Sequence, residues 1–433
     1  MGEQKEQFLK EVTGHIQSKE ARKLVEQELQ CHLQKTKNDW LVRGLSAEES
    51  EDKAIRQMGD PLKIGMKMNK LYRPKVDWFL LGLLLMVMLL GVLPMLHLHY
   101  PEELTEQFLQ NKLIFGLLGI GTAIGLMFVD YRKLARMGWL FFGIGVLILY
   151  VLRFNPSYMI NGEPFIGIPG IGTVGCWIAT PFFFLAWARF FARKNRKAWQ
   201  LALLFVYTLY LFMTIPNLTI TFIYGAMVMI MLWWSHLGRR TVLWLTIVPI
   251  GVSAGIIGTA FLLGYVNDYQ MERFFAFLNP ENYADGSGYM YLRLSEVMSG
   301  ANWFGASASQ LDFSSSPHTD FALANVTANY GYAAAAGVIF ILFLFVLRMG
   351  MIAIGTRDRY GRLLVVGAIS LFGLQFFYNL GMIFGILPIM AVSLPFISYG
   401  WMPTMLNAFL MGIVLSVYRR RNFIQIEKGC TAD

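Results

Sequence analysis

The sequence predicts an all-α, polytopic membrane protein with about ten transmembrane helices, and three observations support this fold class. Hydrophobic residues make up 55% of the 433 positions, whereas charged residues make up only 15%. Ordinary soluble domains carry about 25% charged residues. The charge is also uneven, because 28 of the first 77 residues are charged. The chain therefore combines a small soluble part with a large membrane part.

Residues 1–77 are expected to form a small helical cytoplasmic domain, because two apolar stripes repeat at helical spacing. Ser46 and Glu49 match a capping box that opens a third helix. Asp60-Pro61 begins a fourth, lysine-rich segment directly before the membrane, which suits either an anionic leaflet or a solvated helical face. The stripes consist of Phe8, Leu9, Val12 and Ile16, and of Ala21, Val25, Leu29 and Leu33.

Apolar segments near the ~20 residues needed to span hydrocarbon fill the rest of the chain. They predict a ten-helix membrane domain over residues 78–425, followed by a cytoplasmic tail over 426–433. The ten segments are approximately 78–98, 113–129, 136–153, 174–192, 198–214, 217–235, 242–265, 321–347, 362–386 and 403–418.

The basic residues between these segments predict the orientation of the chain. With the N-terminus inside, the inner loops and the C-terminal tail hold 18 Lys and Arg residues. The outer loops then hold four, which are Lys112, Arg153, Arg273 and Arg293. Cytoplasmic loops carry the excess of positive charge in membrane proteins. We therefore expect both termini in the cytoplasm, and the basic excess indicates membrane orientation rather than nucleic-acid binding.

One long loop, residues 266–320 between the seventh and eighth segments, is the main candidate for function. It carries seven of the eleven acidic residues that this orientation places outside. Loops of this length are usually functional or disordered, and the aromatic residues throughout argue against disorder. Within it, residues 286–298 are expected to form a short amphipathic helix.

Asp320, at the entrance of the eighth segment, is the candidate reactive group of this loop. A carboxylate at such a place is costly unless it is solvated or paired. Two compatible interpretations remain open: Asp320 caps the eighth helix, or it carries out chemistry. The HExxH and Walker-loop signatures are absent from the sequence.

Four stretches of the chain resemble the SEDS family of FtsW/RodA/SpoVE-type membrane proteins. The resemblance covers about residues 78–425, and the residues before it are similar to the helical prefix of some permease-like proteins of Gram-positive bacteria. The matching stretches are His318-Thr-Asp-Phe321; Leu387-Pro388 with Leu394-Pro-Phe-Ile-Ser-Tyr-Gly400 and Asn379 upstream; Arg273 with Phe277-Leu-Asn-Pro280 and Gly286-Ser-Gly-Tyr289; and Pro216-Asn-Leu-Thr219.

The resemblance implies a peptidoglycan glycosyltransferase in the bacterial cytoplasmic membrane, serving cell shape, division or sporulation. Such a protein polymerises lipid II at the outer face of the membrane, beside a class B penicillin-binding protein. It implies that Asp320 is the catalytic carboxylate, which takes the proton of the acceptor hydroxyl. No cofactor follows from the resemblance, and a need for a divalent cation stays open. The implied substrate-binding residues are His318, Thr319, Arg273, Arg293, Tyr289 and Ser398.

Departures from the family pattern keep two other functions open. Gln310 stands where the family usually has Lys, and Ala328-Asn329 replace its usual acidic pair. A non-catalytic scaffold for the penicillin-binding protein would tolerate these changes. A transporter of lipid-linked precursors would instead require ionisable residues near the bilayer midplane, and the predicted helix centres hold none.

Overall fold

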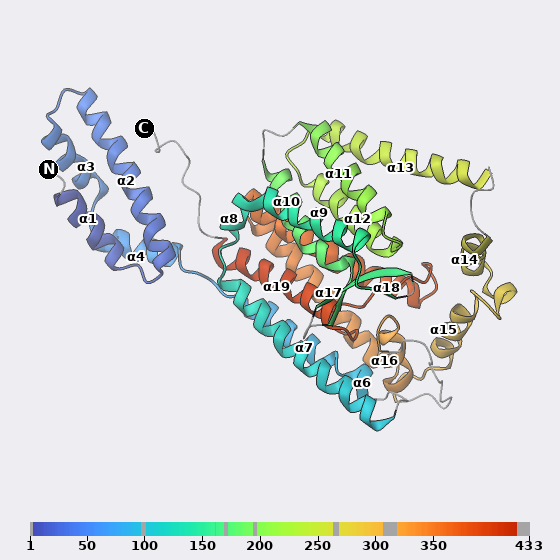
Figure 1. The fold of residues 1–433 in the computed structure, drawn as a ribbon. Coiled ribbons are helices and arrows are strands. Elements are labelled where there is room, and N and C mark those ends of the chain that lie inside the picture. Colours follow the sequence, from blue (N-terminus) through green and yellow to red (C-terminus); the bar gives the residue numbers. More distant parts are fainter. Residues whose placement is uncertain are drawn as a thin grey trace. The chain divides into compact units, whose positions relative to one another are not determined.

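The computed structural model describes residues 3–96, 101–160, 162–168, 172–193, 197–262, 268–305 and 318–421 (Figure 1). The chain divides into two compact units. The first contains residues 1–77 and 418–433, and the second contains residues 78–417. The predicted boundary at residue 425 lies outside the described residues.

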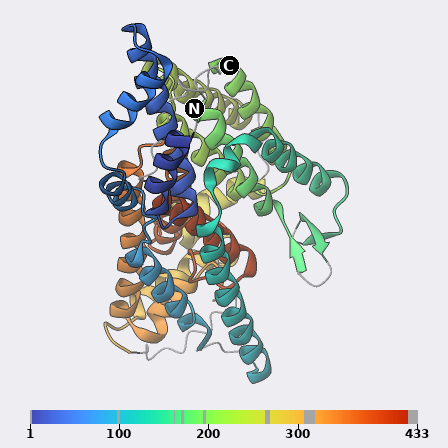
Figure 2. The same cartoon turned by 90° about the vertical axis from the view of Figure 1, so that its left-hand side faces the viewer.

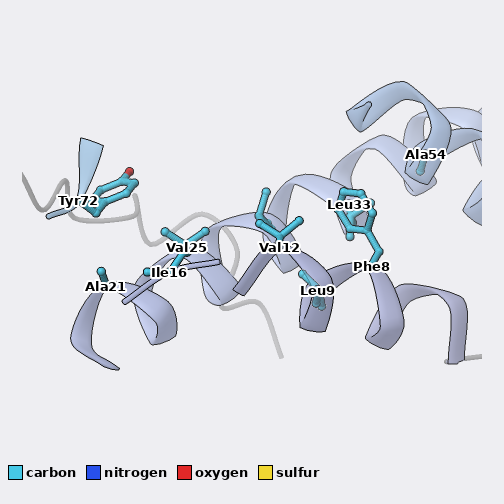
Figure 3. Close-up of a cluster of buried hydrophobic side chains, with 10 residues drawn as sticks. Phe8, Leu9, Val12, Ile16, Ala21, Val25, Leu33, Ala54 and Tyr72 are labelled. Carbon is cyan, nitrogen blue, oxygen red and sulfur yellow. The ribbon is translucent and has the colours of Figure 1, made fainter. Parts of the chain in front are cut away.

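The first unit is a small helical domain whose core is made by the two predicted stripes (Figure 3). Val12 and Val25 are fully buried in it, and Tyr72 closes one end by donating a hydrogen bond to Glu28 at 2.8 Å. The capping box between Ser46 and Glu49 is present. The helices are α1 (Glu3–Gly14), α2 (Lys19–Val42), α3 (Ala47–Met58) and α4 (Pro61–Leu71).

The second unit is helical and membrane-spanning, which confirms the predicted fold class. Each predicted apolar segment contains a helix, and six spans among the described residues are long and apolar enough to cross a membrane. These spans are 78–96, 103–128, 131–154, 332–355, 359–383 and 401–420. The helices are α5 (Trp78–Leu90), α6 (Leu93–Leu96), α7 (Glu102–Phe128), α8 (Tyr131–Leu134), η1 (Ala135–Met137), α9 (Gly138–Phe154), η2 (Cys176–Ala179), α10 (Thr180–Ala192), α11 (Ala198–Met213), α12 (Leu218–Trp233), α13 (Arg239–Leu262), α14 (Asp268–Leu278), η3 (Pro280–Tyr283), α15 (Tyr289–Gly300), α16 (Ala322–Tyr330), α17 (Tyr332–Gly355), α18 (Arg359–Ile383) and α19 (Trp401–Arg420).

The eighth predicted segment is two helices rather than one, because the chain bends at Gly331. Its φ of 85° lies in the left-handed region that favours glycine. A Cβ there would lie 2.6 Å from the carbonyl oxygen of Trp303. The first two amides of α17, from Tyr332 and Ala333, donate to the carbonyls of residues 302 and 303. The bend thus lets residues 302 and 303 of the long loop pair with the start of α17.

The second predicted segment begins eleven residues later than the helix that contains it. Helix α7 starts at Glu102, so Lys112 lies inside the helix, and its side chain is only 3% exposed. The prediction that Lys112 belongs to an outer loop is therefore wrong. Hydropathy located the apolar part of the helix and missed its first, polar turns.

A small antiparallel sheet between α9 and η2 was not predicted (Figure 2). The strands β1 (Tyr158–Ile160), β2 (Glu163–Ile168) and β3 (Gly172–Val174) lie in the order β1-β2-β3. Asn217, the N-cap of α12, donates from its amide to Glu163 Oε2 at 2.9 Å. The strands are short, which explains why their periodicity gave no usable signal.

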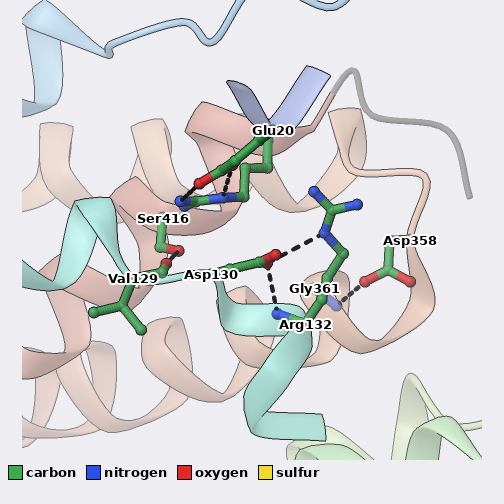
Figure 4. A network of polar contacts seen from close by, with 8 residues as sticks. Glu20, Val129, Asp130, Arg132, Asp358, Gly361 and Ser416 are labelled. Atoms are coloured by element: carbon green, nitrogen blue, oxygen red, sulfur yellow. Dashed lines mark hydrogen bonds and ion pairs between the residues drawn. The ribbon is translucent and has the colours of Figure 1, made fainter. Parts of the chain in front are cut away.

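Polar groups close several helix ends (Figure 4). In the second unit, Ser416 Oγ donates to the Val129 carbonyl at 2.5 Å, and Asp358 caps α18 by accepting from the Gly361 amide at 2.7 Å. Within the first unit, the Arg420 guanidinium donates twice to the Glu20 carboxylate, at 2.9 and 3.0 Å. Such bidentate pairs fix geometry as well as charge.

Candidate active site

The HTDF turn, residues 318–321, precedes α16 and has three consecutive carbonyls held from outside. The carbonyls belong to His318, Thr319 and Asp320. In this order, they accept from the Tyr399 amide at 2.7 Å, from Ser398 Oγ at 2.5 Å and from Asn379 Nδ2 at 2.8 Å. Three donors from α18 and the segment after it therefore fix the backbone of the turn.

Two of these donors belong to the SYG loop, residues 394–400, between α18 and α19. Its Ser398 hydroxyl also accepts from the Leu394 amide at 2.8 Å, which closes the loop on itself. Phe396 has a φ of 64°, the only positive value among the described non-glycine residues. Asn379 is fully buried and donates to the Val392 carbonyl as well, at 2.6 Å. The loop is therefore a constrained structure rather than a flexible connection.

The imidazole of His318 packs between two aromatic rings. Its centroid lies 4.8 Å from that of Phe108 on α7 and 5.4 Å from that of Tyr399. Burial lowers the pKa of His318, which favours the neutral ring at neutral pH. The ring therefore contributes to the wall of the site without adding positive charge.

The Asp320 carboxyl is partly buried, and burial raises its pKa to about 6. No described residue donates a hydrogen bond to its carboxylate. Helix α16 has Phe321 at its N-cap position, with no side-chain cap hydrogen bond. The capping role is therefore not seen, and the carboxylate is left for another purpose. A carboxylate with a pKa raised toward the working pH suits general-base chemistry.

Ser398 was predicted to contact the substrate, but in the structure its side chain is buried. It is 1% exposed, and its hydroxyl already serves Thr319 and Leu394. Thr319 itself is partly buried. In this structure Ser398 lies behind the turn and holds the backbone that carries Asp320.

The other predicted contacts lie on α14 and α15. Arg273 is exposed on α14, and Tyr289 is 50% exposed at the start of α15. Arg293 is partly exposed and pairs with Glu296 on its own helix at 2.7 Å. Arg273 and Tyr289 therefore present polar groups to the surface, unlike the residues around the HTDF turn.

Helix α15 is joined to the segment that leads into the SYG loop. The Tyr291 hydroxyl accepts from the Ile389 amide at 2.9 Å. At the preceding residue, the Pro388 carbonyl accepts from the Tyr378 hydroxyl of α18 at 3.1 Å. The Leu387-Pro388 motif thus lies where α15 and α18 meet the same segment.

Asn329, which departs from the family pattern, carries an uncharged amide that takes part in hydrogen bonds along α16. Asn329 donates to Asn325 Oδ1 at 2.6 Å and to its carbonyl at 3.0 Å, one turn back along α16. Asn325 in turn donates to the Pro94 carbonyl of α6 at 3.3 Å. Gln310 lies outside the described residues. An amide ladder therefore occupies the face where the family usually has an acidic pair.

The sequence did not reveal the structural roles of two residues near the site, Asn379 and Lys112. Asn379 was recognised by its position in the motif, not as the donor to the Asp320 carbonyl. Lys112 donates from Nζ to the carbonyls of residues 396, 397 and 398, at 2.8, 3.0 and 2.7 Å. The available signal is a lysine at the edge of an apolar run, but the distribution of basic residues places this lysine in an outer loop.

This arrangement is that of a polytopic helical membrane protein with a carboxylate at one end of its helices. The FtsW/RodA/SpoVE family model, described as "Cell cycle protein", matches residues 75–423. The chain therefore belongs to the FtsW/RodA/SpoVE family, as its motifs indicated.

Curated relatives and a solved structure agree with this assignment. The chain is 25% identical over 325 residues to "Probable peptidoglycan glycosyltransferase FtsW" of Trichlorobacter lovleyi, covering 72% of this chain and 83% of the relative. It is 30% identical over 164 residues to "Peptidoglycan glycosyltransferase MrdB" of Escherichia coli K12, covering 37% and 44%. The fold is similar to a chain described under "Structural coordination of polymerization and crosslinking by a peptidoglycan synthase complex", with a TM-score of 0.67, 22% identity, and coverage of 80% and 98%.

Proposed function

We propose that the protein is a peptidoglycan glycosyltransferase that polymerises lipid II, with Asp320 as its general base. The observation that carries this proposal is the combination of a raised pKa at Asp320 and a turn fixed through three successive carbonyls. Membership of the FtsW/RodA/SpoVE family and the names of the relatives support the same activity.

In this mechanism the ionised Asp320 accepts the proton of the acceptor sugar hydroxyl. The hydroxyl oxygen forms a bond to the anomeric carbon of the lipid-linked donor, and the bond from that carbon to the pyrophosphate oxygen breaks. Arg273 or Arg293 binds the donor pyrophosphate and offsets its negative charge both before and during the reaction. The fixed backbone keeps the carboxylate in place, which reduces the reorganisation needed at the reacting oxygen.

The working arrangement that we propose places the HTDF turn and helices α14 and α15 at the outer face of the membrane. Both termini then lie in the cytoplasm, in keeping with the excess of basic residues in the inner loops. A class B penicillin-binding protein is the proposed partner, and a solved structure of similar fold comes from a peptidoglycan synthase complex.

A second candidate function is a non-catalytic scaffold for the same partner. The observation that favours it is the neutral amide ladder of Asn325 and Asn329 beside α6, where the family usually has acidic residues. Restoring Glu at positions 328 and 329 in an inactive parent would show whether the lost charge explains the inactivity.

The experiment that tests the proposed function uses the purified full-length protein with fluorescent lipid II, with and without a class B penicillin-binding protein. We expect glycan strands whose formation stops when lipid II is replaced by its unlinked disaccharide-peptide. Absence of strands with every class B partner of the same cell would contradict the proposal and favour the scaffold.

A further inference from the structure

The Lys112 ammonium is an internal cation in the wall of the membrane domain. Its side chain is 3% exposed, and Nζ lies 2.8, 3.0 and 2.7 Å from the carbonyl oxygens of Phe396, Ile397 and Ser398. An ammonium group has three N–H donors, so all of them are used. An ionisable residue inside a transmembrane segment is rare and usually marks a function.

The three acceptors are successive carbonyls that would otherwise repel one another. Phe396 reaches this arrangement with a φ of 64°, in the left-handed region that side chains avoid. The backbone of Gly91 packs directly on it, because a Cβ there would lie 2.5 Å from the Phe396 oxygen. Without the ammonium, these three buried carbonyls would have no hydrogen-bond donor in the part of the chain that the structure describes, and this is strongly unfavourable in a membrane.

The same loop residues hold the candidate active site from their other side. Ser398 offers its carbonyl to Lys112 and its hydroxyl to the Thr319 carbonyl. The next residue, Tyr399, donates its amide to the His318 carbonyl. A continuous chain of hydrogen bonds therefore runs from Nζ through the SYG loop to the turn that carries Asp320.

We propose that Lys112 is a positioning residue, which sets the conformation of the SYG loop and, through it, the placement of the HTDF turn. Its consequence for catalysis rests on the proposed function, whereas its effect on the loop does not. Lys112 acts on the reaction through the backbone, since its three donors are occupied by protein.

Hydrogen exchange of the full-length protein in detergent, read by mass spectrometry, tests the effect on the loop. The informative amides are those of Leu394, Ser398 and Tyr399, which are hydrogen-bonded within the site. In Lys112→Met, which keeps length and removes the donors, we expect at least tenfold faster exchange of peptides covering 394–400. Peptides from the interior of α12 should exchange as in the parent. Lys112→Arg, which keeps charge and N–H donors, should retain most of the protection.

Gly91→Ala tests the contact between Lys112 and the Phe396 carbonyl without removing the lysine, because the added Cβ would lie 2.5 Å from that oxygen and 3.3 Å from Nζ. Its Cβ would displace the Phe396 oxygen, so the same peptides should lose protection. Gly82→Ala, on α5, is the matched control because nothing lies within 4 Å of the Cβ added there. This pair keeps the inference testable if Lys112→Met does not fold.

Polymerisation kinetics then test the catalytic consequence. Lys112→Met and Gly91→Ala should lower kcat by about 10- to 100-fold with little change in KM for lipid II, as expected when a catalytic group is misplaced. Unchanged exchange of residues 394–400 in both variants would overturn the inference, as would a rise in KM at constant kcat. If the parent does not polymerise lipid II, the proposed function fails, and the exchange data still decide whether Lys112 sets the loop.

Discussion

The HTDF turn and the α14–α15 segment both carry residues predicted to act on the substrate, but the structure uses their polar groups in opposite ways. Around the turn, the polar groups of Asn379 and Ser398 are buried and committed to backbone carbonyls. On α14 and α15, Arg273 and Tyr289 present theirs to the surface. One region is preorganised within the protein, whereas the other lies at the surface.

This difference predicts a division of labour in the kinetics. Preorganised groups that hold a reacting carboxylate affect the transition state, so their loss lowers kcat. Exposed cations that meet the substrate before the reaction contribute to binding in both states, so their loss raises KM. The substitutions below test this contrast between residues that affect kcat and residues that affect KM.

Among the residues that hold the turn or meet the substrate, the largest effect is expected for Asn379→Leu. The fully buried amide donates to the carbonyls of Asp320 and Val392, and both would lose their donor. Each orphaned buried group costs roughly 1–3 kcal/mol, so the free energy of unfolding should fall by about 2–5 kcal/mol and kcat by at least tenfold. Asn111→Leu, which removes only a 3.3 Å contact with the Tyr399 hydroxyl, should do much less. Equal effects of the two variants would contradict the assignment.

A smaller loss is expected for Ser398→Ala. One hydroxyl links the Leu394 amide to the Thr319 carbonyl, and its removal should lower kcat about 5- to 20-fold, corresponding to roughly 1–2 kcal/mol. Ser393→Ala on the same segment is the matched control. Steady-state lipid II kinetics are the measurement, and a change confined to KM would instead make Ser398 a substrate contact.

A change in binding is expected for Arg273→Gln and Arg293→Gln. Removing one charge-assisted contact to pyrophosphate from a partly exposed site should raise KM about 5- to 10-fold, with kcat within a factor of two. Arg153→Gln, another residue of the predicted outer side, should leave KM unchanged. If either substitution on α14 or α15 lowers kcat alone, these helices belong to the preorganised region.

The smallest effects concern pH and stability at Asp320, whose pKa is raised to about 6. The base must be ionised, so kcat/KM should fall as the pH drops through about 6. The free energy of unfolding changes with pH in the opposite direction. Because the pKa of Asp320 is higher in the folded state than in the unfolded state, ionisation of the carboxyl as the pH rises above 4–6 lowers the stability of the fold. Asp320→Asn should therefore raise the melting temperature at pH 7.5 and lose this advantage below pH 4. A variant less stable than the parent at pH 7.5 would show that the carboxylate has a stabilising partner.

Sequence reasoning recovered the features that repeat along the chain. The stripes of the first unit form its core because burial follows helical periodicity, and the apolar segments became helices because hydrocarbon requires them. The bend at Gly331 and the position of Lys112 depend on contacts with distant residues. A single glycine or lysine carries no period, so these features could not be predicted.

The site was predictable only as a set of motif residues. The HTDF and SYG motifs identified Asp320, but not the hydrogen bonds by which one motif holds the other. Those bonds use backbone carbonyls, which every residue has, so the sequence carries no mark of them. The absence of a cap at Asp320 likewise depended on where α16 begins.

The most direct test of the central claim is lipid II polymerisation by Asp320→Asn beside the parent protein, each purified with the same class B partner. Asn keeps the shape of the side chain and removes the basic oxygen, and general bases contribute on the order of 10²–10⁴-fold. We predict a loss of this size in kcat, with normal expression, an unchanged elution volume and an unchanged KM for lipid II. Parental activity in Asp320→Asn would contradict the assignment of Asp320 as the general base.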